Sequence, residues 1–167
     1  MPVDGILRTV LDLTHTSPAD LSTPASRLLM DKSNGFASGV GANQADRLWH
    51  DTRTLAASAT EDLDLAGVLT DVFGAAFTLA KLRLLWVRAA IGNTNNVNVT
   101  RPAANGVPIF LAAGDGVPVV PGGDFRFVAP NAAGIAVTAG TGDLITFTNS
   151  AGSTGVTFDV VILGTSA

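Results

Sequence analysis

Apolar and polar residues alternate along the second half of the chain, and this alternation predicts short strands. Over residues 123–129, Phe125 and Phe127 share one face while Asp124 and Arg126 share the other, as in a strand with one buried side. The same period of two recurs in two later segments. The residues expected to face a core there are Ile145 and Phe147 in segment 144–148, and Val156, Phe158 and Val160 in segment 156–160. Glycine turns separate these segments, which favours a sandwich or a barrel.

Residues 77–90 are the most ambiguous part of the pattern. The stretch is apolar over a length that would also suit a helix. Its β-branched and aromatic residues, and the turn that follows at 92–96, favour a strand instead. Within this strand, Leu82, Leu84 and Trp86 are expected to line the core between two sheets.

Further strands are predicted around this segment. Leu63 and Leu65 alternate with Asp62 and Asp64, which is typical of a strand. Residues 68–76 are expected to be a loop with about one helical turn, because an aspartate and a glycine interrupt both periodicities. The chain is also regular over residues 47–55, and short strands are predicted at 97–100, 107–112 and 117–120.

Residues 1–44 differ in texture from the rest and predict an extended N-terminal arm. Pro18, Pro24 and a loop-like segment at 33–35 are expected to interrupt it before any long regular element forms. One strand is predicted over residues 6–13, with one face made of Leu7, Thr9, Leu11 and Leu13. Such an arm either holds a neighbouring subunit or frays.

These elements predict an all-β fold, an antiparallel β-sandwich of jelly-roll type over residues 45–167, with the arm at 1–44. About eight strands at short spacing suit two packed sheets. No alternation of strands with helices is visible, so a parallel α/β sheet is not expected.

The composition indicates a surface with few charges. Charged residues make up 14% of the 167 residues and apolar ones 47%, and the charged share is well below that of ordinary soluble domains. A single copy would therefore expose much neutral or apolar surface. We expect other subunits or a larger assembly to cover part of it, which favours a homo-oligomer.

The charge and the cysteine count exclude several classes of protein. The net charge of −4 and the absence of a basic cluster argue against a nucleic-acid surface. With no cysteine, neither a disulfide framework nor a thiolate metal site is possible. No secretory signal is apparent, and charged residues interrupt the most apolar region, 63–91, so no membrane association is expected.

Candidate catalytic residues are few. His15 and His50 are the only side chains that titrate near neutral pH, and His50 beside Asp51 is the best candidate for a catalytic or metal-binding pair. Adjacent strand residues point to opposite faces, so a structural histidine is favoured. The acidic residues Glu61, Asp62 and Asp64 match no complete calcium loop. We therefore expect no enzyme, and no catalytic, cofactor-binding or metal-binding residues.

Three segments carry a resemblance to known proteins. They are GVGANQADRLWHDTRTLAASATEDLDLAG at 39–67, PGGDFRFVAP at 121–130 and VTAGTGDLITFTNSAGSTGVTFDVVILG at 137–164. Together they resemble a family of small virion proteins of tailed bacteriophages. The most specific pieces are ATEDLDLAG, the PGG turn and the TAGTGD turn. The resemblance implies a structural role in the virion, after assembly in the host cytoplasm, and brings no catalytic residues with it.

Within that setting, two roles are expected. The first is a capsid decoration or cement protein, for which a trimer is favoured, that binds the major capsid protein and stabilises the head lattice. The alternative is a tail-tip or tail-fibre module that contacts tail proteins and the host surface. Exposed loops at 92–96 and 112–117 would then carry the binding. These loops contain asparagines but no aromatic residues, which favours decoration.

Overall fold

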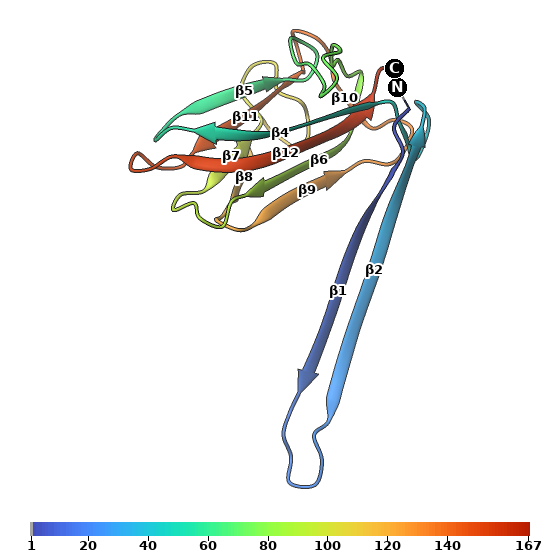
Figure 1. Ribbon diagram of the computed structural model, residues 1–167, viewed down its shortest axis with the longest axis vertical. Coiled ribbons are helices and arrows are strands. Elements are labelled where there is room, and N and C mark those ends of the chain that lie inside the picture. Colours follow the sequence, from blue (N-terminus) through green and yellow to red (C-terminus); the bar gives the residue numbers. More distant parts are fainter. Residues whose placement is uncertain (1) are drawn as a thin grey trace.

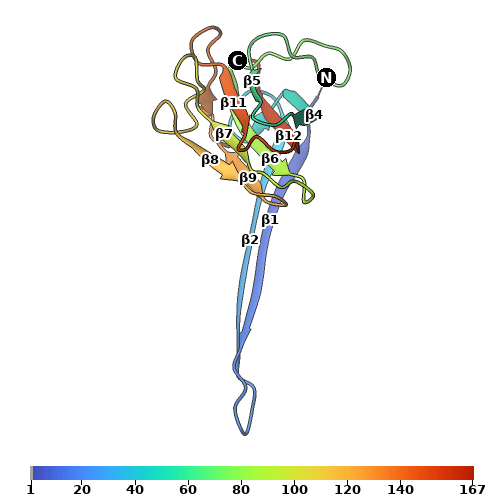
Figure 2. The same ribbon diagram turned by 90° about the vertical axis from the view of Figure 1, so that its left-hand side faces the viewer.

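The computed structural model describes residues 2–167, and these residues form strands and loops without any helix. Two antiparallel sheets pack against each other, and a long two-stranded ribbon projects from one end of them (Figures 1 and 2). The prediction of an all-β fold is confirmed. The prediction of a helical turn at 68–76 is wrong, because this segment is a loop.

The five-stranded sheet, called the large sheet below, has the order β10-β6-β12-β4, and β9 also pairs with β6. Its strands are β4 (Arg47–Leu55), β6 (Lys81–Ala89), β9 (Asp124–Val128), β10 (Ile135–Ala136) and β12 (Val156–Thr165). The four-stranded small sheet has the order β5-β11-β7-β8. Its strands are β5 (Thr60–Asp64), β7 (Val97–Thr100), β8 (Gly116–Val119) and β11 (Leu144–Asn149).

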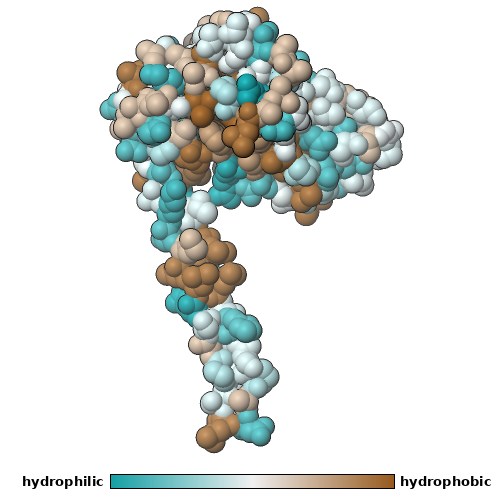
Figure 3. Space-filling model, turned by 180° about the vertical axis from the view of Figure 1, so that it is seen from behind, coloured by the Kyte–Doolittle hydropathy of each residue, from teal (hydrophilic) through white to brown (hydrophobic). Residues whose placement is uncertain are grey.

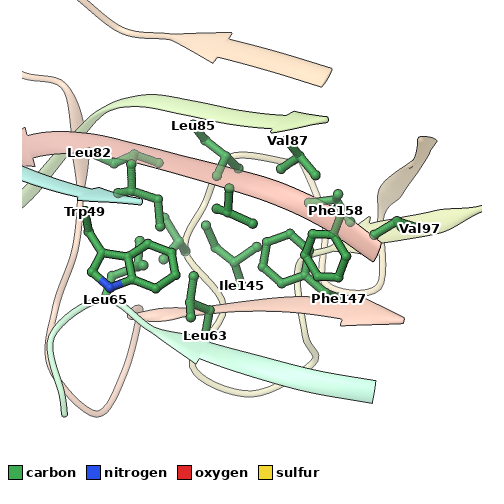
Figure 4. Close-up of a cluster of buried hydrophobic side chains, with 14 of the residues drawn as sticks. Trp49, Leu63, Leu65, Leu82, Leu85, Val87, Val97, Ile145, Phe147 and Phe158 are labelled. Atoms are coloured by element: carbon green, nitrogen blue, oxygen red, sulfur yellow. The ribbon is translucent and has the colours of Figure 1, made fainter. Parts of the chain in front are cut away.

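The core lies between the two sheets (Figure 4). Phe147 of the small sheet and Phe158 of the large sheet stack with ring centroids 5.1 Å apart, which joins the sheets at the centre. All five residues that the alternation assigned to the core at 144–148 and 156–160 are buried. Each buried aromatic or large aliphatic side chain contributes about 1.5–3 kcal/mol to folding.

A β-bulge in β6 changes which of its residues face the core. Opposite β12, Leu163 pairs with Leu84 but Gly164 pairs with Leu82, so Arg83 is an extra residue in β6. The alternation shifts phase at this point. Leu82 faces the core, but beyond the bulge Leu85 and Val87 do so, while Leu84 and Trp86 lie on the outer face.

The prediction that Leu82, Leu84 and Trp86 share the inter-sheet core is therefore wrong for two of the three residues. The tryptophan in the core is Trp49 of β4, which is 4% exposed. A prediction that assumes strict alternation along the strand cannot detect one extra residue. Every residue from Arg83 to Leu85 is buried, so no change from apolar to polar marks the bulge in the sequence.

Two further expectations fail for local reasons. Residues 107–112 form a loop and not a strand, and the carbonyls of Phe110 and Leu111 accept hydrogen bonds from the Arg101 guanidinium instead of from a neighbouring strand. The segment 33–35, expected to break the arm, lies inside a long strand, β2 (Ala25–Ser38). Gly35 is unexceptional there, because it carries no positive φ.

Gly164 beside the bulge predicts a measurable constraint. A Cβ atom there would lie 2.3 Å from the Lys81 carbonyl oxygen and 2.8 Å from a methyl of Leu79. We expect Gly164→Ala to lower the free energy of unfolding by about 1–3 kcal/mol, because a backbone atom cannot move aside as a flexible side chain can. The control is Gly92→Ala, where a Cβ would meet nothing within 4 Å. Urea denaturation of both variants measures the difference, and equal stabilities would contradict the close approach.

Candidate functional site

The predicted pair His50 and Asp51 does not form a catalytic centre. The two residues are neighbours on β4, and His50 is exposed on the outer face of the large sheet. The Asp51 carboxylate instead pairs with Arg53, with an Nε to Oδ2 distance of 3.2 Å. His15 lies far away on the arm, in β1 (Gly5–Thr16). The sequence-based preference against a convergent pair agrees with this geometry.

The acidic residues of β5 are used in separate local contacts. Glu61 pairs with Arg53 at 3.3 Å, Asp62 accepts a hydrogen bond from the Thr146 hydroxyl, and an Asp64 carboxylate oxygen accepts the Ala66 N–H at 2.9 Å. Among residues 2–167 no three histidine or acidic side chains gather as metal ligands would.

The arm is a two-stranded ribbon, and its anchor is on the outer face of the large sheet. β1 and β2 pair antiparallel from Gly5 with Phe36 to Thr16 with Ala25. The end of β2 also pairs in parallel with the short strand β3 (Gln44–Ala45). At the base of the arm, Leu7 and Phe36 pack on Leu84 and Leu163. The Arg126 guanidinium also donates to the Thr9 hydroxyl at 3.3 Å.

One face of the ribbon, which we call the apolar arm face, carries a row of unpartnered hydrophobic side chains. In the register Leu11 opposes Met30 and Leu13 opposes Leu28, so all four side chains share the face that Leu7 begins. Each is between 42 and 60% exposed. Figure 3 shows apolar side chains as a brown patch on the arm below the sandwich.

The opposite face of the ribbon carries its charges in pairs. Arg8 bonds Asp31 through two nitrogen atoms, and Arg27 bonds Asp12 at 2.7 and 2.9 Å. The hydrogen bonds from Arg27 lower the pKa of the Asp12 carboxyl. The pairs are fully exposed, so they solubilise this face and fix the register more than they stabilise the arm. Ile6, Val10 and Leu29 also lie on this face and are 51 to 75% exposed. The ion pairs therefore distinguish it from the apolar arm face, which carries no carboxylate.

Sequence reasoning found only half of the apolar arm face. The alternation placed Leu11 and Leu13 on one face of a strand, which is confirmed. Leu28 and Met30 were missed because the run Leu28-Leu29-Met30 shows no alternation. The available signal was the matching length of the segments before Pro18 and after Pro24, which is what a hairpin needs.

A hollowed area on the outer face of the large sheet is the second candidate binding surface. Three adjoining depressions of about 530, 310 and 220 Å³ lie between the base of the arm and the loop 66–76. Their apolar lining includes Leu48, Val72, Phe73, Trp86 and Val161. We call this surface the sheet hollow.

Polar and charged side chains border the sheet hollow. Arg88 pairs with Asp159, and the Thr52 hydroxyl donates to the same carboxylate at 2.7 Å. The hydrogen bonds from Thr52 and then from Arg88 lower the pKa of Asp159. Trp86 is held by a hydrogen bond from its indole N–H to Asp124 at 3.0 Å. An apolar floor with a polar border is the composition of a protein interface.

The loop 92–96, which was predicted to carry receptor contacts, is held in place by two of its own asparagines. Asn95 is buried, and its amide donates to the Asn149 side chain and to the Thr154 carbonyl. Asn93 bonds the backbone of Thr157 in both directions. These side chains therefore order the loop and do not face solvent as free recognition groups.

No helix long and apolar enough to cross a membrane occurs among residues 2–167. Comparison of the chain with family models, with curated proteins and with solved structures gives no match in any of the three.

Proposed function

We propose that the protein is a structural component of a bacteriophage virion, and specifically a decoration protein that binds the head lattice. The observation that carries the proposal is the long ribbon with exposed apolar side chains that projects from the sandwich (Figure 1). A lattice protein can use such an arm to hold a neighbour. The resemblance of segments 39–67, 121–130 and 137–164 to small virion proteins supplies the biological setting.

We further propose that the sandwich is of jelly-roll type. The strand orders β4-β12-β6-β9 and β5-β11-β7-β8 support this wiring, because successive strands from β4 to β7 alternate between the sheets and β12 returns between β4 and β6. Jelly rolls with eight strands in two sheets are common in viral capsid proteins and lectins. The link from this fold to a virion is an analogy, and the arm carries the functional argument.

The mechanism we propose is clamping of neighbouring subunits. Beyond the base that packs on the sheet, β1 continues over residues 10–16, which at about 3.4 Å per residue gives the paired part of the arm a reach of about 24 Å. That reach suffices to extend from the sandwich across a seam to another subunit. A protein that binds only the assembled lattice stabilises it, by the linkage between binding and assembly. The proposed partner is the major capsid protein, and the proposed oligomer is a trimer.

The copy number in purified particles tests this function. Quantitative mass spectrometry should give a ratio to the major shell protein that approaches one copy per shell subunit or a simple fraction of it. A handful of copies per particle would overturn the decoration role and favour the tail-tip or tail-fibre role. Absence of the protein from purified particles would overturn a virion role altogether.

A further inference from the structure

The chain presents two unpartnered apolar surfaces of different shape. The apolar arm face is a narrow convex row made of Leu11, Leu13, Leu28 and Met30. The sheet hollow is a concave area on the outer face of the large sheet. We propose that the apolar arm face of one copy docks in the sheet hollow of a second copy. This inference rests on the proposed function, since it treats the arm as an assembly device.

The arm needs a partner for its own stability. A two-stranded ribbon is marginally stable in water at best, and it becomes stable when it packs against another layer. Away from its base, however, the ribbon projects from the sandwich in both views (Figures 1 and 2). Its apolar side chains point at no other part of the same chain, because each of the four remains at least 42% exposed.

The same chain already shows this type of contact at the base of the arm. Leu7 and Phe36 belong to the same ribbon face as the exposed row, and they pack on Leu84 and Leu163 of the large sheet's outer face. The sheet hollow continues that outer face toward Trp86 and the loop 66–76. Docking between copies would therefore repeat, farther along the ribbon, a contact that occurs within one copy.

The charges of the apolar arm face and the sheet hollow are also complementary. The apolar arm face carries no acidic residue. Its one lysine, Lys32, lies opposite Thr9. The sheet hollow is lined by five carboxylates against two arginines and one histidine, the carboxylates being Asp4, Asp46, Asp51, Asp71 and Asp159. Three of these carboxylates are paired with arginines, Asp46 with Arg47, Asp159 with Arg88 and Asp51 with Arg53. The acidic excess of the hollow is therefore two carboxylates, Asp4 and Asp71. An apolar row flanked by a lysine therefore suits this border, whereas an acidic partner would not.

The contact joins different surfaces of two copies, so it is heterologous. Heterologous contacts form a closed ring when the rotation between copies closes. A ring of three agrees with the trimer proposed above, and in such a ring every arm and every hollow is filled.

Two neighbouring residues of β2 provide a matched test in solution. Met30 lies on the apolar arm face and is 60% exposed, while Leu29 lies on the opposite face and is 55% exposed. Sedimentation velocity should find the wild type and Leu29→Glu as oligomers and Met30→Glu as a monomer. Neither side chain belongs to the core between the sheets, so the thermal unfolding midpoint of the sandwich should be the same in both variants. A monomeric wild type, or a Met30→Glu variant that stays oligomeric, would overturn the inference.

Crosslinking between single-cysteine variants identifies the docking surface. The chain has no cysteine, so Leu13→Cys on the arm and Val72→Cys in the hollow introduce unique thiols. A short bis-maleimide should link an equimolar mixture into dimers that contain one copy of each variant. Dimers of Leu13→Cys alone, without mixed dimers, would mean that arms pack on each other and would overturn the hollow as the partner. Failure to link in any combination would overturn it too.

These measurements separate the inference from the proposed function. A protein abundant in particles but monomeric in solution would remove the docking inference and leave the decoration role. An oligomer held by the arm but absent from particles would remove the decoration role and leave the docking inference.

Discussion

Replacing Trp49 with alanine should lower the free energy of unfolding by about 3–5 kcal/mol, the range for emptying a large buried aromatic site. Trp49 lies in the core between the sheets, with its ring centroid 6.5 Å from that of Phe77. Trp86→Ala should be clearly less destabilising, because Trp86 is half-buried on the outer face and its removal opens no closed cavity. Urea denaturation followed by circular dichroism measures both.

The comparison tests the bulge at Arg83 directly. Without that extra residue, Leu82, Leu84 and Trp86 would share one face of β6, and Trp86 would be the core tryptophan. Trp86→Ala would then be about as destabilising as Trp49→Ala. A Trp86→Ala variant as unstable as Trp49→Ala would therefore contradict the phase shift, and not only the position of one side chain.

Arg83→Ala should also destabilise the protein strongly, by about 3 kcal/mol. Arg83 is fully buried, and one nitrogen of its guanidinium donates to the carbonyls of Val40, Gly41 and Ala132, each at 3.1 Å. Truncation leaves these carbonyls without a partner, at about 1–3 kcal/mol for each group that water cannot reach. Burial lowers the pKa of Arg83, and this cost of desolvation offsets part of the loss.

Arg88→Ala is the control for this prediction. Arg88 is on the same strand and pairs with Asp159, but its side chain is 62% exposed. An exposed ion pair contributes about 0–1 kcal/mol. Thermal or urea unfolding should therefore separate the two arginines clearly. Equal stabilities of Arg83→Ala and Arg88→Ala would mean that the loop contacts of Arg83 contribute nothing net.

The sequence predicted the strands of the sandwich where apolar and polar residues alternate, as at Phe147 and Phe158. It failed where both faces of a strand are covered. The base of the arm covers the outer face of β6 at Leu84, so apolar residues on both sides of the strand removed the alternation that reveals a bulge. Such double covering is a tertiary effect that no local pattern contains.

The candidate binding surfaces were harder to predict than the fold. The sheet hollow combines side chains from the arm base, β4, the loop 66–76, β6 and β12, so only the strand order brings them together. The arm was predicted as a segment, but its hairpin was not, because Asn34 and Gly35 are typical of turns and yet lie within β2. The low charge of the chain did predict that apolar surface would remain exposed.

The position of β12 in the large sheet determines when the sheet can be completed during translation. β12 lies between β4 and β6 in the large sheet but follows both in the chain, and β4 must wait for a partner about a hundred residues away. The β1–β2 hairpin, by contrast, pairs residues that are close in sequence. While the ribosome is still translating, the arm can therefore form, but Val161 and Leu163 of the outer face are not yet made. In the proposed docking, a nascent chain would offer an arm without a surface to receive one, so unfinished chains would not assemble with each other until translation has passed β12.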